Sequence, residues 1–157
     1  MRRINMINLH FTVTINAPRE KVWDTVIGPE TYKAWTSAFA EGSYYDGSWE
    51  TGSKIRFLGP GGEGGMSSEI AENRKHEFLS IRHLGIIKDG IEDFTSPEAK
   101  AWTPADENYT FTAGDCVTHM DVDVSVPPEY EKMFGEMWPK ALRSLKDICE
   151  GRAHAAA

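Results

Sequence analysis

Two segments place an apolar side chain at every second position. In residues 9–15 Leu, Phe, Val and Ile alternate with His and Thr, and residues 116–126 repeat this alternation with Val and Met. Successive side chains of a strand point to opposite faces, so each segment predicts a half-buried β-strand. Similar but shorter patterns predict further strands at 54–58, 66–73, 78–87 and 109–113.

Helical spacing dominates the end of the chain. Between residues 129 and 150 apolar side chains recur at intervals of three and four, which predicts one long amphipathic helix. Near the start, Pro18 and Glu20 suit the first turn of a short helix that ends at Gly28-Pro29. A second short helix is predicted over residues 30–35.

These elements predict an α+β fold. The apolar stripe of the last helix needs an apolar surface, and the inward faces of the strands offer the only one of comparable size. Consecutive strands joined by short turns, such as the hairpin signal Asp46-Gly47, indicate a meander of about six strands. We expect a single domain over residues 1–151 and a disordered tail over 152–157.

Two motifs at opposite ends of this pattern carry a family resemblance. The first lies in residues 11–35 and contains Ala17-Pro18-x-x-x-Val22-Trp23; the second is Trp138-Pro139-x-x-Leu142-x-x-Leu145-Lys146. With them the chain resembles the START-like (SRPBCC) superfamily, in the branch named for the activator of the heat-shock-90 ATPase. The resemblance implies a START/Bet v-like helix-grip fold. A curved antiparallel sheet of about six to seven strands would surround the C-terminal helix and leave a cavity beside it. Members of the superfamily bind lipids, hormones or polyketides, and some are cyclases, lyases or hydrolases.

Large apolar side chains on the predicted inward faces of these strands and helices are candidates for the cavity wall. Each could equally belong to an ordinary packed core, and both interpretations stay open at this point. The candidates are Trp35, Phe39, Phe57, Met66, Ile81, His83, Tyr109, Phe111, Met120, Phe134, Met137 and Trp138.

Three polar residues are weak candidates for chemistry in that cavity. His83 shares a strand face with Leu79 and Ile81, so its imidazole could orient a ligand or move a proton. The alternative is a core histidine whose hydrogen bonds are satisfied. Glu69 and Arg82 are the charged strand residues for which an inward orientation is worth testing.

Other site classes find little support. A net charge of −7 opposes nucleic-acid binding, and no apolar stretch is long enough for membrane insertion. Cys116, Cys149 and the histidines lack metal-ligand spacing, so we expect no metal and no cofactor. Gly59-x-Gly61-x-x-Gly64 matches a dinucleotide fingerprint, but a hairpin loop explains it better. Two cysteines without a disulfide framework favour a cytoplasmic protein.

The function that follows is binding of a small hydrophobic or lipid-like ligand between sheet and C-terminal helix. The alternatives are a cyclase- or hydrolase-type enzyme that uses the same cavity, or a co-chaperone-like interaction module; a chaperone partner is the least expected. A homodimer is left open. Residues 85–107 either form a lid over the cavity or an elaborated loop, and we favour the loop.

Overall fold

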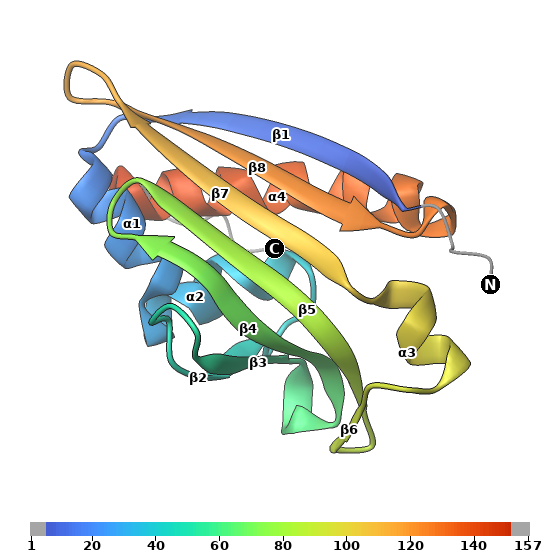
Figure 1. The fold of residues 1–157 in the computed structure, drawn as a ribbon. Coiled ribbons are helices and arrows are strands. Elements are labelled where there is room, and N and C mark those ends of the chain that lie inside the picture. The colour runs from blue at the N-terminus through green and yellow to red at the C-terminus, as the bar shows by residue number, and fades with distance from the viewer. Residues whose placement is uncertain (1–5, 152–157) are drawn as a thin grey trace.

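One antiparallel sheet of eight strands forms the body of the protein in the computed structural model, which describes residues 6–151 (Figure 1). The strand order is β1-β8-β7-β5-β4-β3-β2, and β6 pairs with β5 outside this path. The strands are β1 (Ile7–Ile15), β2 (Tyr44–Gly47), β3 (Lys54–Leu58), β4 (Gly64–Arg74), β5 (Phe78–Lys88), β6 (Ile91–Asp93), β7 (Ala105–Ala113) and β8 (Thr118–Val126).

The alternation in the sequence becomes a two-sided sheet. β1 and β8 pair antiparallel, with Phe11 opposite Val122 and Val13 opposite Met120 on the inward face. On the outward face His10 lies between Asp121 and Asp123, with Nδ1 2.7 Å from the Asp123 carboxylate. Burial therefore alternates along β8 as the pattern of residues 116–126 predicts.

Within the described residues, four α-helices accompany the sheet. α1 (Arg19–Ile27) and α2 (Pro29–Trp35) follow β1, α3 (Pro97–Trp102) lies at the opposite end, and α4 (Glu131–Cys149) runs along the concave side (Figure 1). The Ser96 hydroxyl caps α3 by accepting a hydrogen bond from the Ala99 amide at 3.1 Å. The predicted α+β helix-grip arrangement, with two short helices after the first strand, is confirmed.

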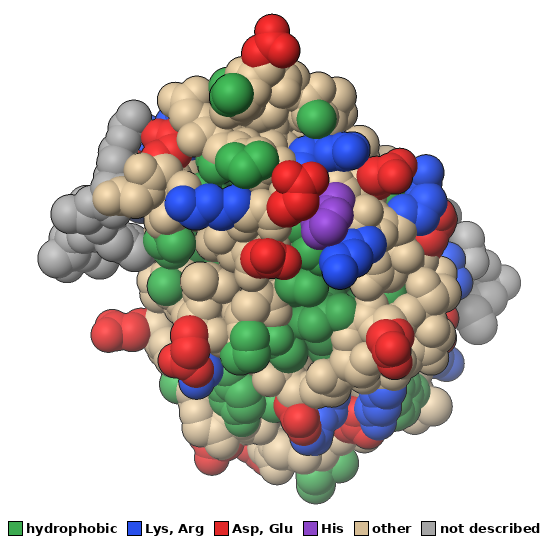
Figure 2. All heavy atoms as spheres, turned by 90° about the vertical axis from the view of Figure 1, so that its left-hand side faces the viewer, with side chains coloured by type: hydrophobic (Ala, Val, Ile, Leu, Met, Phe, Trp, Pro, Cys, Tyr) green, Lys and Arg blue, Asp and Glu red, His purple; other side chains and the backbone are tan. Residues whose placement is uncertain are grey.

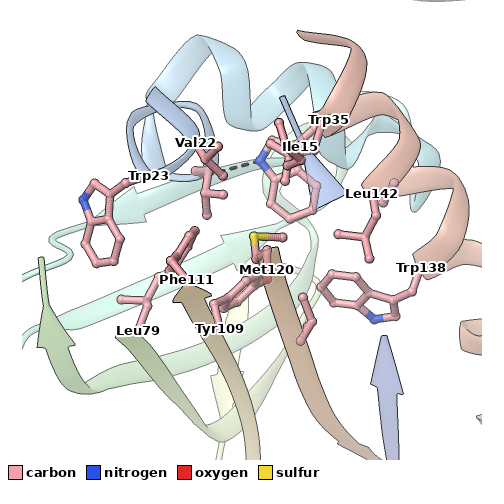
Figure 3. Packing of buried hydrophobic residues seen from close by; sticks show 14 of the residues in the cluster. Ile15, Val22, Trp23, Trp35, Leu79, Tyr109, Phe111, Met120, Trp138 and Leu142 are labelled. Carbon is pink, nitrogen blue, oxygen red and sulfur yellow. Dashed lines mark hydrogen bonds between the residues drawn. The ribbon is translucent and has the colours of Figure 1, made fainter. Parts of the chain in front are cut away.

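The long helix is buried along one half only. Its buried residues begin at Trp138 and continue to Cys149, whereas residues 131–137 are exposed or partly buried. Around the buried half, side chains from α1, β5, β7 and β8 pack together in one core (Figure 3). Trp35 fixes α2 to α1 in this core, because its indole Nε1 donates to the Val26 carbonyl at 3.2 Å. The other half of α4 faces a less tightly filled part of the sheet.

Three details differ from the sequence prediction or lie beyond it. The sheet has eight strands, since the unpredicted β6 pairs with the end of β5. Asp46-Gly47 is not the hairpin turn but the end of β2, and residues 48–53 make the connection to β3. The predicted tail at 152–157 lies outside the described residues.

Acidic and basic side chains are mixed on the face that carries α1 and the β4–β5 turn, with small apolar areas between them (Figure 2). Within residues 6–151 no helix combines the length and the apolar character that crossing a bilayer requires.

Candidate functional site

A cavity of about 480 Å³ lies between the first half of α4 and the concave face of the sheet. α2, β3, β4, β5, α3, β7 and β8 also contribute to its wall. Most of the wall is aromatic or aliphatic; its aromatic members are Tyr32, Trp35, Phe39, Phe57, Trp102, Tyr109, Phe134 and Trp138. The fold therefore leaves open space where the helix is only partly buried.

Eight of the twelve residues named from the sequence line this cavity. They are Trp35, Phe39, Phe57, Met66, His83, Tyr109, Phe134 and Trp138. The rings contact one another closely: the centroids of Phe39 and Trp138 are 4.9 Å apart, and those of Trp35 and Trp138 are 6.2 Å apart. Helix α2, the turn after it and α4 thus form a continuous aromatic wall opposite the sheet.

The remaining four residues do not line the cavity. Ile81, Phe111 and Met120 are almost fully buried in the core, and Figure 3 shows Met120 packed near Tyr109 and Trp138. Met137 is partly buried on α4 and lies outside the lining. Phe111 and Met120 do not reach the cavity because of their position along the sheet. They lie at the end where α4 and α1 pack on the concave face.

A chain of hydrogen bonds runs along the sheet side of the cavity. His83 Nε2 lies 3.0 Å from Glu107 Oε1, and its Nδ1 lies 2.6 Å from the hydroxyl of the buried Ser68. The Tyr109 hydroxyl donates to the second carboxylate oxygen of Glu107. A neutral imidazole with its hydrogen on Nε2 satisfies both of its contacts, since it donates to Glu107 and accepts from Ser68. Three of these four side chains, all but Ser68, line the cavity.

The two tyrosines of this region stay neutral donors. Burial, and then the negative charge of Glu107, raise the pKa of Tyr109 well above its ordinary value of 10.0. The same two causes, in the same order, raise the pKa of Tyr32 on the facing helix α2. The carboxylate of Glu107 therefore sits among hydroxyl groups that do not ionise near neutral pH.

This environment predicts a specific alkaline instability. Because the folded state holds the Tyr109 proton more tightly than the unfolded chain does, its stabilising contribution is complete below pH 10 and declines above it. Above about pH 10 the free energy of unfolding should fall with rising pH. We expect this fall to be less steep in Tyr109→Phe than in the unaltered protein, by about 1.4 kcal/mol per pH unit. Urea unfolding at a series of alkaline pH values measures it; parallel curves for the two proteins would contradict the assignment.

Glu69 and Arg82 do not reach the cavity. They pair on the outer face of the sheet, with Arg82 Nη1 3.8 Å from Glu69 Oε1 and its Nε 3.5 Å from Asp106. Their place follows from strand alternation, because Arg82 lies between two inward residues, Ile81 and His83, and Glu69 is its partner on β4. The inward orientation that the sequence left open is not found for Glu69 or Arg82.

The site contains residues that the sequence reading missed. The predicted loop over residues 85–107 includes Glu107, although β7 begins at Ala105 and has Ala105, Glu107 and Tyr109 on one face. Extending the alternation of Tyr109 and Phe111 backwards by one step would have found it. Tyr32 and Trp102 carry no comparable signal, since each lies on a helix too short for a periodic pattern.

The segment 85–107 forms one end of the cavity wall. Glu98 of α3 pairs with Lys88 of β5 at 3.2 Å, and the Trp102 ring lies 4.6 Å from that of Tyr130, just before α4. On β6, Glu92 accepts from the Ser67 hydroxyl at 2.6 Å. The segment is therefore fastened to the sheet and to the start of the long helix.

Two other motifs can be placed. The glycine-rich residues 59–64 form a hairpin loop that leads from β3 directly into β4, without the helix that a dinucleotide-binding turn requires. Among residues 6–151, no three His, Cys, Asp or Glu side chains are grouped so that they could hold a metal ion.

Comparison with known proteins gives one family match. A model of the family described as "Activator of Hsp90 ATPase homolog 1-like protein" matches residues 16–150. No curated protein matches the chain in sequence.

Solved structures share its fold at low sequence identity. Protein MLL2253 from Mesorhizobium loti aligns with a TM-score of 0.70 and 16% identity, over 94% of this chain and 99% of that chain. The Aha1 dimer from Colwellia psychrerythraea aligns with a TM-score of 0.69 and 21% identity, over 92% and 97%. DynU16, a protein in the dynemicin biosynthetic locus, aligns with a TM-score of 0.67 and 19% identity, over 92% of this chain and 48% of that chain.

Proposed function

Because the chain belongs to the family of Activator of Hsp90 ATPase homolog 1-like proteins, we propose that it uses the cavity of its helix-grip fold to bind a small, largely hydrophobic ligand. The observation that carries the proposal is the open space of about 480 Å³ beside an otherwise well-packed core. This volume falls within the range of roughly 300–1,000 Å³ that is usual for small-molecule sites. A mostly apolar wall with a few converging polar groups is also typical of such sites.

The aromatic wall supports the proposal on energetic grounds. Apolar ligand surface buried against it gains roughly 25 cal/mol per Å². Phe57 of β3 and Trp138 of α4 both line the space, so a ligand bound there would contact aromatic rings of the sheet and of the long helix. Binding would come mainly from area burial, and the polar chain of His83 and Glu107 would set the orientation.

A neutral fluorescent probe tests the proposal. N-phenyl-1-naphthylamine emits strongly in apolar surroundings, and we expect saturable binding in the micromolar range. Ala105→Phe places a phenyl ring in the cavity from β7, where Ala105 is a buried wall residue. This variant should weaken probe binding at least about tenfold, because the ring occupies the volume that the probe needs.

The matched control is Ala113→Phe, the same substitution at an exposed position of the same strand. It should leave the affinity unchanged, and circular dichroism should show both variants folded. A folded Ala105→Phe protein with unchanged affinity would refute binding in the cavity.

An enzyme of the cyclase kind is the second candidate. The observation in its favour is the hydrogen bond between His83 and Glu107 inside the cavity, which is a common arrangement for acid–base chemistry. The fold similarity to DynU16, which belongs to a biosynthetic locus, supports the same idea. Turnover of an aromatic polyketide that is lost in His83→Ala, while probe binding remains, would establish it.

Other roles rest on less. The co-chaperone role rests on the family's description alone and stays a prediction. A homodimer stays a prediction as well, with the dimeric Aha1 structure as its support. Cytoplasmic location is likewise a proposal, consistent with two free cysteines, Cys116 and Cys149.

A further inference from the structure

The carboxylate of Glu107 has hydrogen-bonding capacity that the protein does not use. An ionised carboxylate offers about four acceptor positions. Among the described residues only His83 Nε2 and the Tyr109 hydroxyl donate to it, one to each oxygen. The side chain of Glu107 keeps 22% of its surface accessible, and it lines the cavity. Its remaining acceptor positions are therefore available to a ligand in the cavity.

Glu107 differs from the other carboxylates around the cavity in the groups that it contacts. Glu98 at the α3 end is compensated by Lys88 at 3.2 Å, and Asp106 lies 3.5 Å from Arg82. Glu107 accepts hydrogen bonds from the His83 imidazole and the Tyr109 phenol, and no lysine or arginine of the described residues pairs with it. In surroundings of aromatic rings its negative charge is poorly screened by water, so it acts strongly on any group placed beside it.

We propose that the cavity selects an apolar, ring-containing ligand whose hydroxyl group donates a hydrogen bond to Glu107, and that it discriminates against ligands that carry a carboxylate. This inference rests on the proposed binding function and names the ligand class. Fatty acids, the lipid-like ligands with a free carboxylate, are thereby disfavoured. A ligand hydroxyl matches the unused acceptor positions, whereas a ligand carboxylate placed there would bring a second negative charge against Glu107. Lys88, the lysine of the cavity wall, is already paired with Glu98.

The position of Tyr32 agrees with this chemistry. Tyr32 lines the cavity from α2 and packs its ring at 6.1 Å from that of Phe57. No described residue forms a hydrogen bond with its hydroxyl. The hydroxyl of a ligand bound at Glu107 could therefore accept from Tyr32 while it donates to the carboxylate, which uses both capacities of an alcohol.

Two probes that share one ring system test the selection. 2-Naphthol and 2-naphthoate differ in the group they present, a neutral hydroxyl or an anion at pH 7. Each competes with N-phenyl-1-naphthylamine for the unaltered protein. We expect 2-naphthol to bind at least about tenfold more tightly, the ratio expected for one hydrogen bond to a charged group. Equal affinity, or tighter binding of 2-naphthoate, would overturn the inference.

Glu107→Gln then identifies the residue responsible. It keeps the shape of the side chain and removes its charge, so we expect the preference for 2-naphthol to shrink to about twofold or less. Glu72→Gln, an exposed glutamate on β4, should keep the full preference. If Glu107→Gln keeps it too, Glu107 is not the selecting group. If N-phenyl-1-naphthylamine itself does not bind, the proposed function fails, which is a different result from binding without selection.

Discussion

Replacing Leu145 by alanine should lower the free energy of unfolding by about 3–5 kcal/mol. Leu145 has no exposed surface, and it belongs to the core cluster in the half of α4 that carries the buried residues. Removing most of its side chain leaves a void in a close-packed core that relaxes only in part, so the cavity cost adds to the lost burial. Urea unfolding followed by circular dichroism measures the change.

The control for this prediction lies on the same helix. Met133 is 40% exposed in the half of α4 that contains no buried residue. Met133→Ala should cost no more than about 0.5 kcal/mol. Similar losses for the two variants would mean that α4 is not buried along one half only.

Gly65→Ala should destabilise the fold by about 2–4 kcal/mol. Gly65 has a φ of +153°, and a Cβ added there would lie 1.9 Å from the carbonyl oxygen of Phe57 on the neighbouring strand. Because that contact is with backbone, β3 and β4 would have to separate, and both strands contribute to the cavity wall. Thermal unfolding and probe binding should therefore decline together.

The adjacent glycine is the matched control. At Gly64 an added Cβ would come no closer than 3.8 Å to its nearest neighbour, the carbonyl oxygen of Ile87. Gly64→Ala should change stability by less than about 0.5 kcal/mol. A Gly65→Ala protein as stable as Gly64→Ala would show that the pairing of β3 with β4 is looser than described.

Most of the fold could be predicted because it depends on periodicity. β8 and α4 have patterns long enough to define both the element and its buried face, and the family match to residues 16–150 confirms the resemblance drawn from the motifs at either end. The strand β6 could not be predicted, since three residues are too few for alternation. The hairpin turn predicted at Asp46-Gly47 was wrong, because this residue pair ends a strand instead. The glycine is needed there since Gly47 passes close to the backbone of Lys54.

The candidate site was only partly predictable for a different reason. Alternation identifies the inward face of a strand, so Phe57, His83 and Tyr109 could be named. It does not tell which inward residues face open space, which depends on how far along the sheet α4 is buried. Phe111 and Met120 therefore belong to the packed end although their pattern is the same. The pairing of His83 with Glu107 joins two strands and has no local signal.

The two halves of α4 explain why stability and binding can be separated in this protein. The half from Trp138 onwards holds the core together, while the earlier half, with Phe134, covers a cavity that the sheet does not fill. Substitutions such as Leu145→Ala should thus act on stability, and Ala105→Phe on binding. Trp138 belongs to both regions, since it is 4% exposed and also lines the cavity.

A crystal structure of the protein grown with N-phenyl-1-naphthylamine is the most direct measurement. We predict electron density for the probe between α4 and the sheet, in contact with Phe57, Tyr109 and Trp138. Density for the probe elsewhere on the surface, with side chains filling the space between helix and sheet, would contradict a ligand-binding role for the cavity.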